Sequence, residues 1–367
     1  MSKLPSTTRT LVAPKKCPPA EYEIMKQPIP TITKPYEVLL RMKGVAINTG
    51  DTQLASGEFG ILTKGLNYPL PIGLEGSGVV AAVGSAVTEF KVGDEVYGME
   101  LEKPLFSRPA AAWGSTYAVT EPKFIHLKPD HVSFEEAAAI PGLTATAYQT
   151  IRRGLQLQGR DSLAGQTVYI PAALSASGST LIQVARNYFG AEKIISTVST
   201  PKMGLVEDYL PGMVNQLYDY KSQDVVKLIG RGTVDFAVNT QFTTIDDCIA
   251  VLNPHTGILM SITSIPKSEV MLEMMGPKHF PVWLGWLLDF LQYWYTWKLR
   301  GTKIKYEFLS GNPGIREDME VVAGMVTQGK VKPVLTAVDF DDLEEVRSAC
   351  ERVNKSKGGL GKLVIRI

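Results

Sequence analysis

Small and hydroxyl-bearing side chains follow the short apolar segment 168–170, and they could bind phosphate. The stretch reads Pro-Ala-Ala-Leu-Ser-Ala-Ser-Gly-Ser-Thr, with Gly178 as its single glycine. In a doubly wound α/β sheet, the turn after the first strand binds the pyrophosphate of a dinucleotide, because glycines let the backbone approach and a helix N-terminus faces the anion. Hydroxyl groups could do part of this work here; they belong to Ser175, Ser177, Ser179 and Thr180. Taken alone, the stretch fits an ordinary strand–loop–helix connection equally well.

The segment 196–202, Ser-Thr-Val-Ser-Thr-Pro-Lys, bears on the choice between two nicotinamide cofactors. Sites for NAD place Asp or Glu near this point to hold the ribose 2′-hydroxyl, and this segment carries no carboxylate. Lys202 can neutralise a 2′-phosphate, Ser199 and Thr200 can donate hydrogen bonds to it, and Tyr220 could cover the same pocket. The alternative for Lys202 is a solvated surface lysine. Together these residues favour NADPH over NADH.

Cysteine and histidine residues are few and scattered. The chain has three cysteines and four histidines: Cys17, Cys248, Cys350, His126, His131, His255 and His279. Their spacing forms no CxxC motif and no even disulfide framework, which favours a reduced intracellular compartment. Catalytic zinc needs three protein ligands of the Cys, His and Glu types. We therefore expect no metal site.

Composition limits the class of protein. The chain has 367 residues with a formal net charge of +1, 44% hydrophobic and 20% charged residues. This length predicts two domains, and the balanced charge argues against nucleic acid or an anionic surface as the main partner. The first ten residues, Met-Ser-Lys-Leu-Pro-Ser-Thr-Thr-Arg-Thr, lack the apolar core of a secretory signal. We expect a cytoplasmic protein.

The residues that could do chemistry must be positioned by two kinds of folding pattern. Short apolar segments with Gly and Pro punctuation predict a β barrel-like head; they lie at 37–43, 78–83, 93–97 and 114–119. From Ser133 onward, strands alternate with helices, which indicates βαβ units and a parallel sheet. The tail returns to a strand at 361–367. We predict one discontinuous domain over 1–140 plus 312–367, and an inserted dinucleotide-binding domain over 141–311.

The ordered combination of these segments resembles the medium-chain dehydrogenase/reductase superfamily over nearly the whole chain. The head supplies further matches at Val45–Asn48 followed by Asp51, and at 71–80, 92–98 and 135–147. The resemblance implies an α/β fold in which a GroES-like β-rich domain, built from the head and the tail, carries an inserted Rossmann domain with a doubly wound parallel sheet.

Two positions distinguish the branch of the superfamily. Zinc alcohol dehydrogenases carry Cys where this chain has Asn48 and His where it has Leu74, and they have a four-cysteine lobe. The chain is similar instead to the zinc-free quinone reductases and enoyl reductases. Within that branch it resembles the trans-acting enoyl reductases of fungal polyketide synthases, which also have a Ser/Thr/Ala-rich turn in place of the glycine-rich one.

The resemblance implies a set of cofactor contacts. It adds Gly50, Asp51, Thr52, Gln53, Ile262, Thr263, Gly361 and Lys362 to the Ser175, Ser177, Gly178, Ser199–Lys202 and Tyr220 set. Some of those reductases have Lys where this chain has Gln53. A neutral amide can orient the cofactor, but it cannot supply a charge or act as an acid.

The reaction implied is conjugate reduction of an α,β-unsaturated acyl group. Hydride passes from NADPH to the β-carbon, and the resulting enolate takes a proton at the α-carbon. Thr144 could donate a hydrogen bond to the enolate, and Asn48 could position the nicotinamide region. Tyr148 could donate the proton, although packing within a helix is the better interpretation of this residue; bulk water is the other proton source.

The segment 281–297, Pro-Val-Trp-Leu-Gly-Trp-Leu-Leu-Asp-Phe-Leu-Gln-Tyr-Trp-Tyr-Thr-Trp, is densely aromatic. It is shorter than the ~20 residues a membrane-spanning helix needs, so we expect a buried or partly buried helix instead. We predict that Trp283, Trp286 and Phe290 help line a channel for a long acyl chain. A surface for a second copy or for a partner protein is the alternative.

Two other functions remain open at this stage. One is a broad quinone or alkenal reductase that uses the same cofactor. The other is a non-redox relic of the fold, either an isomerase or cyclase or a protein that binds a partner; the loss of glycines from the loop favours it slightly. For the first interpretation the expected partners are a small-molecule or carrier-tethered acyl substrate and a polyketide synthase, and the expected state is a monomer or homodimer.

Overall fold

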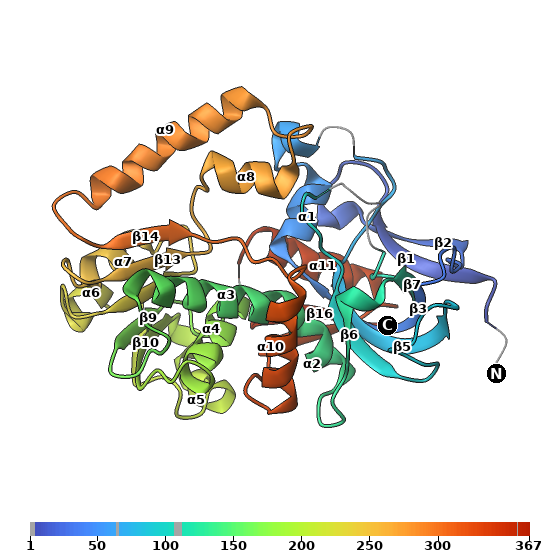
Figure 1. Cartoon of the computed structure of the whole chain (residues 1–367), viewed down its shortest axis with the longest axis horizontal. Helices are drawn as coiled ribbons and strands as arrows, with labels where there is room; N and C mark the ends of the chain where they lie inside the picture. Colours follow the sequence, from blue (N-terminus) through green and yellow to red (C-terminus); the bar gives the residue numbers. More distant parts are fainter. Residues whose placement is uncertain (1–3, 64–65, 106–111, 358) are drawn as a thin grey trace. The chain divides into compact units, whose positions relative to one another are not determined.

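The computed structural model describes residues 4–63, 66–105, 112–357 and 359–367, and the chain divides into two compact units (Figure 1). Unit 1 comprises 1–142, 313–319 and 335–367; unit 2 comprises 143–312 and 320–334. The segment 320–334 therefore groups with the second unit, whereas we assigned all of 312–367 to the first domain. Hydrogen bonds explain the difference: Gln183 Nε2 donates to Lys332 O at 2.8 Å, and Asn187 Nδ2 donates to Lys330 O at 2.7 Å.

Unit 1 is built on two β-sheets. A seven-stranded sheet has the order β15-β16-β3-β5-β6-β8, with β7 also paired to β3, and a three-stranded sheet has the order β2-β1-β4. The strands are β1 (Thr7–Ala13), β2 (Glu23–Pro28), β3 (Val38–Ile47), β4 (Leu70–Pro71), β5 (Glu75–Val83), β6 (Glu95–Met99), β7 (Tyr117–Thr120), β8 (Ile125–Leu127), β15 (Leu335–Asp339) and β16 (Lys362–Arg366). The helices are α1 (Thr49–Ser56), α2 (Phe134–Ala139) and α11 (Leu343–Asn354).

The tail completes the sheet of the head. β16 pairs antiparallel with β3, so that Leu363 lies opposite Ile47. β3 in turn pairs with β5, which places Ala46 opposite Glu75. This register brings Asn48, Glu75 and Lys362 to one place in the sheet, and it confirms the predicted β domain made of head and tail.

Unit 2 contains a six-stranded parallel sheet of order β11-β10-β9-β12-β13-β14. The strands are β9 (Thr167–Ile170), β10 (Lys193–Val198), β11 (Gln216–Asp219), β12 (Phe236–Asn239), β13 (Ile258–Ser261) and β14 (Lys305–Phe308). The chain order reverses between β9 and β12, which is the switch point of a doubly wound sheet. This Rossmann-like arrangement confirms the predicted fold class.

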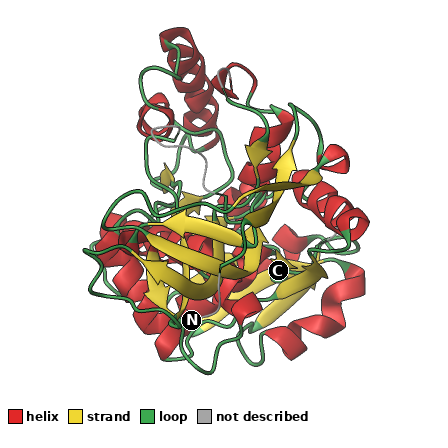
Figure 2. Ribbon diagram, turned by 90° about the vertical axis from the view of Figure 1, so that its right-hand side faces the viewer, coloured by secondary structure: helices red, strands yellow, loops and turns green. Residues whose placement is uncertain are grey.

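Helices alternate with these strands along the chain. Figure 2 shows the helices in red and the strands in yellow. They are α3 (Pro141–Gln158), α4 (Ala176–Asn187), α5 (Val206–Tyr209), α6 (Val225–Ile229), α7 (Ile245–Val251), α8 (Ser268–Met275), α9 (Val282–Lys298) and α10 (Arg316–Thr327). Local signals set several helix starts: Ser133 and Glu136 form the predicted capping box of α2, and Asp224 caps α6. Among the described residues, no helix is both long and apolar enough to cross a membrane.

Candidate functional site

The loop between β9 and α4 has the geometry of a phosphate-binding turn. Ser175 caps α4: its Oγ accepts a hydrogen bond from Gly178 N at 3.0 Å. A Cβ built on Gly178 would lie 2.1 Å from Ala172 O, so only glycine fits at this close approach. The Ser175 hydroxyl keeps its proton for an outside acceptor, and the first N–H groups of a helix are open to an anion.

Alanine replaces glycine at a demanding position of this loop. Ala172 adopts a left-handed backbone with φ of 61°, which costs an L-residue about 1–2 kcal/mol. Thr197 on β10 holds the strained turn: its Oγ1 accepts from Ala172 N at 3.1 Å, and its carbonyl accepts from Ala173 N at 2.8 Å. These two N–H groups are therefore committed within the protein, and anion binding would rely on the helix N-terminus and the serine hydroxyls.

Two of the four predicted hydroxyl ligands face the helix instead. Ser179 Oγ and Thr180 Oγ1 both donate to Ala176 O, at 3.3 and 2.9 Å, and both residues are buried. The prediction for Ser179 and Thr180 is therefore wrong, because a hydroxyl one turn into a helix bonds back to the carbonyl of that turn. Ser175 and the half-buried Ser177 remain at the turn itself.

The end of β10 carries the residues predicted for the ribose phosphate. Ser199 is the residue before the short helical segment Thr200–Leu205, in which Lys202 lies. Partial burial lowers the pKa of the Lys202 ammonium, a cost that a bound anion would offset. Tyr220 is half exposed and carries the Lys221 ammonium over its ring, 5.3 Å from the centroid.

A carboxylate that sequence reasoning missed lies at the end of β11. Asp219 accepts hydrogen bonds from Thr200 Oγ1 and Ser222 Oγ, both at 2.6 Å, and from Lys221 N at 2.9 Å. The two hydroxyl donors, that of Ser222 first, hold the pKa of Asp219 below its usual range. Thr200 cannot donate the same proton to a ribose phosphate, so its predicted role is wrong. Asp219 is visible in the sequence as the carboxylate of the Tyr-Asp-Tyr-Lys motif. It ends β11, the neighbour of β10, whereas the prediction considered only the end of β10.

The turn after β13 is held by a second missed residue. Asn239, at the end of β12, is fully buried; its Nδ2 donates to Ser261 Oγ at 3.0 Å and to Thr263 O at 2.9 Å. Ile262 N donates to the Asn239 carbonyl at 3.1 Å. Since β9, β12 and β13 are parallel neighbours, this turn and the phosphate loop share the carboxyl edge of the sheet. The sequence indicates Asn239 only in that it is a polar residue at the end of an apolar strand.

A buried polar cluster lies around the Val-Ala-Ile-Asn motif of unit 1, which ends at Asn48. Asn48 caps α1 and donates from Nδ2 to Glu75 Oε1 at 3.0 Å, while its own N–H donates to Asp51 Oδ2 at 2.8 Å. The Lys362 ammonium donates to Asn48 Oδ1 and forms an ion pair with Glu75. Glu75 Oε2 accepts from Gly142 N at 2.8 Å. These side chains satisfy one another, which a cluster at this depth requires.

Burial dominates the electrostatics of that cluster. Glu75 is 0% and Lys362 3% exposed. Burial raises the pKa of Asp51 to about 6, against the lowering effects of Asn48 N–H and the Lys362 charge. Asp51 therefore changes charge within the range of ordinary buffers, unlike a surface aspartate.

The remaining residues predicted around the Val-Ala-Ile-Asn motif differ in exposure. Gly50 is exposed at the start of α1, and Gln53 is half buried on the same helix. Thr52 is fully buried, and its hydroxyl donates to Thr49 O at 3.0 Å, so it is engaged inside the helix.

Thr144 and Tyr148 lie in contrasting surroundings on α3. Thr144 is fully buried, and within the described part of the chain its Oγ1 has no hydrogen-bond partner. Tyr148 packs in an aromatic cluster with Tyr188 and Phe189, at centroid distances of 5.6 and 5.8 Å, and its hydroxyl accepts from Arg152 at 3.4 Å. Tyr188 and Phe189 follow the C-terminal end of α4, so the packing alternative describes Tyr148, and we do not assign it the proton transfer.

The aromatic residues predicted for substrate contact lie on an outward face. Trp283, Trp286 and Phe290 of α9 are 54%, 74% and 69% exposed. The expected helix is present, but its aromatic face is open, contrary to the expectation of a buried or partly buried helix.

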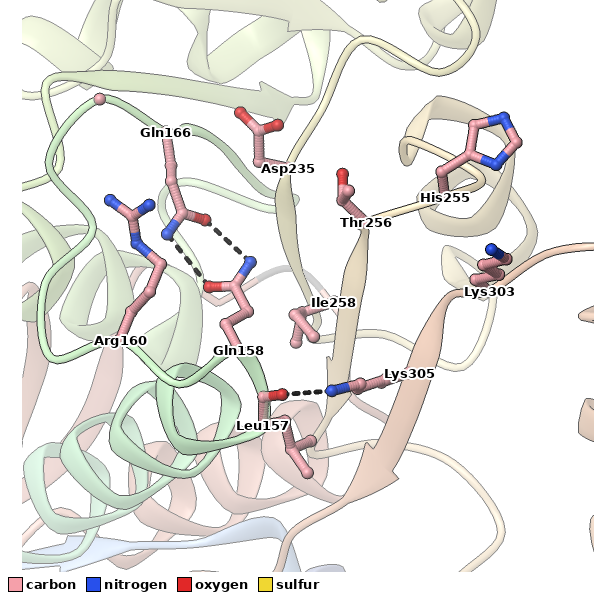
Figure 3. A pocket seen from close by; sticks show the side chains of 11 residues that line it. Leu157, Gln158, Arg160, Gln166, Asp235, His255, Thr256, Ile258, Lys303 and Lys305 are labelled. Carbon is pink, nitrogen blue, oxygen red and sulfur yellow. Dashed lines mark hydrogen bonds between the residues drawn. The ribbon is translucent and has the colours of Figure 1, made fainter.

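A cavity of about 430 Å³ lies at the opposite edge of the sheet of unit 2 (Figure 3). Residues before or at the start of β9, β12, β13 and β14 line it, including Gln166, Asp235, Ile258 and Lys305. The amides of Gln158 and Gln166 pair across it at 3.0 and 3.2 Å. A dinucleotide binds outside the carboxyl ends of the strands, so this cavity at the amino ends is not its site.

In the described ranges, no three His, Cys, Asp or Glu side chains gather as metal ligands. The free cysteines are all buried, at Cys17, Cys248 and Cys350.

Comparison with known proteins agrees with this architecture. The family model "Alcohol dehydrogenase GroES-like domain" matches residues 34–122, and the model "Zinc-binding dehydrogenase" matches residues 214–365. The solved structure of the CurK enoyl reductase has a TM-score of 0.71 at 22% identity and covers 98% of this chain and 99% of its own, which concerns the fold alone.

Two curated relatives illustrate the range of similar sequences. The NADPH-dependent alkenal/one oxidoreductase of Arabidopsis thaliana chloroplasts is 34% identical over 202 residues, covering 54% of this chain and 49% of the relative. The highly reducing polyketide synthase dmxL2 of Cryptosporiopsis is 29% identical over 216 residues, covering 57% of this chain and 8% of the synthase. The chain spans about half the length of several curated relatives that are 34% identical to it.

Proposed function

Because the chain belongs to the medium-chain dehydrogenase/reductase superfamily, we propose that it is an NADPH-dependent, zinc-independent enoyl reductase that acts in trans on an α,β-unsaturated acyl intermediate of the polyketide type. The observation that carries the proposal is the β9–α4 turn, where Gly178 lets the Ala172 backbone pack closely, and where Ser175 and the start of α4 could donate hydrogen bonds to a pyrophosphate. When bound, the nicotinamide cofactor supplies the hydride.

The chain's own residues then bind and orient. Ser175, Ser177 and the N-terminus of α4 hold the pyrophosphate, and Lys202 neutralises the ribose 2′-phosphate with Ser199 beside it. Asn239 fixes the turn of Ile262 and Thr263 at the same edge of the sheet. Tyr220 covers the ribose end. These groups position the cofactor rather than move protons.

The enolate requires a hydrogen-bond donor, and Thr144 fits that requirement. Its buried hydroxyl lacks a partner in the described chain, and an unpaired buried hydroxyl costs about 1–3 kcal/mol unless a ligand satisfies it. Bulk water then supplies the α-proton. In unit 1, Asn48 caps the start of α1, and Lys362 donates a hydrogen bond to Asn48. The residues of α1 that we propose as supports of the nicotinamide are Gly50, Asp51, Thr52 and Gln53.

A cofactor titration tests the proposal directly. NADPH at ~100 times its Kd should raise the free energy of unfolding by about 2.7 kcal/mol, measured as a thermal shift. Lys202→Ala should weaken NADPH about tenfold and leave NADH unaffected, because the removed charge faces only the 2′-phosphate. Lys193→Ala is the matched control, since Lys193 is an exposed lysine at the start of β10, the strand that precedes the segment of Lys202. Equal losses for both cofactors would contradict the assignment of Lys202, and no shift with either would favour the non-redox relic.

A broad alkenal or quinone reductase is the second candidate, and the 34% identity to the alkenal/one oxidoreductase favours it. Both enzymes oxidise NADPH, so the substrate must decide. We expect consumption of NADPH to be fastest with 2-enoyl thioesters of N-acetylcysteamine, compared with free alkenals and quinones. Higher kcat/KM on the free enones would reverse the order of the two candidates.

A further inference from the structure

α9 turns a broad apolar and aromatic face outward. The residues that α9 turns outward are almost all apolar or aromatic: Val282, Trp283, Trp286, Leu287, Phe290, Tyr293, Trp294 and Trp297, with only Asp289 and Thr296 between them. They recur at spacings of three and four, so they form one stripe along the helix. A surface helix of a globular protein normally turns such a stripe toward the core.

Hydrogen bonds and half-buried leucines (Leu284, Leu288 and Leu291) attach α9 to the rest of unit 2. Asp289 accepts from Ser268 N at 2.9 Å and from Ser268 Oγ at 2.7 Å. Gln292 Nε2 donates to Ile265 O at 2.5 Å, and Tyr295 OH accepts from Ile265 N at 3.1 Å. Tyr295 is buried against Tyr306, with a centroid distance of 5.2 Å. The open aromatic stripe is therefore part of a well-attached helix.

The stripe is built of the side chains that favour a bilayer interface. Four of the five tryptophans of the chain lie in it, since the fifth, Trp113, is fully buried in unit 1. Trp and Tyr rings sit at the headgroup level of membranes, where the ring is apolar and its N–H or O–H reaches water or lipid oxygens. Trp294 and Trp297 stack at 5.2 Å, which keeps a flat aromatic surface outward.

Cations flank the stripe at both ends. Lys278 precedes α9, and the segment 298–305, Lys-Leu-Arg-Gly-Thr-Lys-Ile-Lys, carries four positive charges and no negative one. Lys298 pairs with Asp246 and Lys305 bonds Leu157 O, while Arg300, Lys303 and Lys278 are exposed. Figures 1 and 2 both show α9 at the outer edge of unit 2, beside α8. Exposed Glu269 and Glu273 on α8 oppose part of this charge.

We propose that α9 is a membrane-surface anchor, which lays its aromatic stripe into the headgroup region of a bilayer containing anionic lipid. Amphipathic helices with Trp, Phe and Leu on one side and cations beside them bind in this way. Charge complementarity favours lipid over a second copy of the chain, because two copies would bring the same cations together. The proposal is independent of the reaction assigned above.

Vesicle binding by the full chain tests it, and the protein carries its own probe. Because four of five tryptophans lie on α9, vesicles of phosphatidylcholine and phosphatidylserine should shift the fluorescence to the blue, and brominated lipid should quench it. The double variant Trp286→Ser with Phe290→Ser should bind these vesicles at least about tenfold more weakly. Tyr209→Ser is the matched control, because Tyr209 is 41% exposed in the same unit and belongs to α5, which lies far from α9 in Figure 1. Arg300→Gln with Lys303→Gln should weaken binding most at low salt.

Each opposite result overturns the anchor. Absence of vesicle binding at low salt would do so, and so would equal binding by the wild type and the Trp286/Phe290 variant. A dimer in light scattering that the double variant converts to a monomer, without vesicle binding, would show that the stripe is an interface between copies. Circular dichroism of every variant verifies that the fold is intact, which is expected because the altered side chains are exposed.

Discussion

The polar cluster of unit 1 and the phosphate loop of unit 2 use their hydrogen-bonding groups in opposite ways. In the cluster, Asn48, Glu75 and Lys362 are bound to one another, with Gly142 N closing the set. In the loop, the protein ties down the backbone through Thr197 and leaves the hydroxyl of Ser175 and the helix N-terminus able to donate. The first arrangement stabilises a fold, whereas the second is prepared for a ligand.

A buried polar group can act on the stability of the fold or on the binding of a ligand, and its hydrogen-bond partners indicate which. A group whose partners all come from the chain should respond to mutation through the free energy of unfolding. A group that keeps a free donor should respond through ligand affinity. Variants in the polar cluster should therefore change the free energy of unfolding, whereas variants in the phosphate loop should change the affinity for the cofactor.

Lys362→Met should have the largest effect, a loss of about 3–5 kcal/mol in the free energy of unfolding, because it leaves the Glu75 carboxylate buried without its cation. Chemical denaturation at neutral pH measures it. Adding Glu75→Gln should recover much of the loss, since the remaining amide needs no counter-charge. Lys357→Met, at an exposed position near the same strand, should change stability by less than about 0.5 kcal/mol. Equal small losses for both lysines would mean that the cluster is not a structural pair.

Gly178→Ala should weaken NADPH at least about 100-fold, because the new Cβ would meet Ala172 O at 2.1 Å and displace the turn. The change should be visible as loss of the NADPH-dependent thermal shift. Gly324→Ala is the control, as a Cβ at this helical position in α10 meets nothing within 4 Å. If Gly178→Ala keeps its affinity for NADPH, the proposal that this loop binds the cofactor is wrong.

The architecture could be predicted because it follows from local patterns. The apolar strands at 168–170 and 193–198, the capping box at Ser133 and the final strand each carry a period or a cap that one segment reveals. The discontinuous domain made of head and tail followed from the β segments at both ends of the chain, whereas the pairing of β16 with β3 was not predicted. The clash at Gly178 was not visible, but its position as the single glycine of the loop was.

The errors concern side chains whose partner lies elsewhere in the chain. Thr200 donates to Asp219, which is 19 residues away at the end of another strand. The residues around Thr200 alone therefore do not reveal this carboxylate. Tyr148 meets Tyr188 and Phe189, which follow the end of α4, and Asn239 at the end of β12 reaches Thr263 after β13. Such contacts depend on the packing of the sheet and its helices, which periodicity does not specify.

Asp51 should make stability depend on pH, by on the order of 3 kcal/mol. Its folded pKa of about 6 is above the ordinary value for aspartate, so between about pH 4 and 6 the folded protein binds more protons than the unfolded chain. The free energy of unfolding contributed by this group is therefore largest at low pH and falls as the pH rises to about 6. Asp51→Asn should remove that slope in denaturant melts at several pH values. Asp130→Asn, at an exposed site, should keep it; an unchanged slope in Asp51→Asn would assign the titration to another group.

The smallest effect is expected at the outward stripe of α9. Trp286→Ala combined with Trp294→Ala should alter the ratio of kcat/KM between long and short 2-enoyl thioesters by less than about twofold in the absence of vesicles, because both rings face outward, at 74% and 56% exposed. Assays on thioesters of increasing chain length measure this ratio, with Tyr209→Ser as the exposed-aromatic control. A loss confined to long chains would restore the predicted acyl channel, since a channel wall is felt only by the substrate that reaches it. A loss confined to assays with anionic vesicles would instead follow from the anchor, because the vesicle would then hold both the enzyme and its lipophilic substrate at one surface.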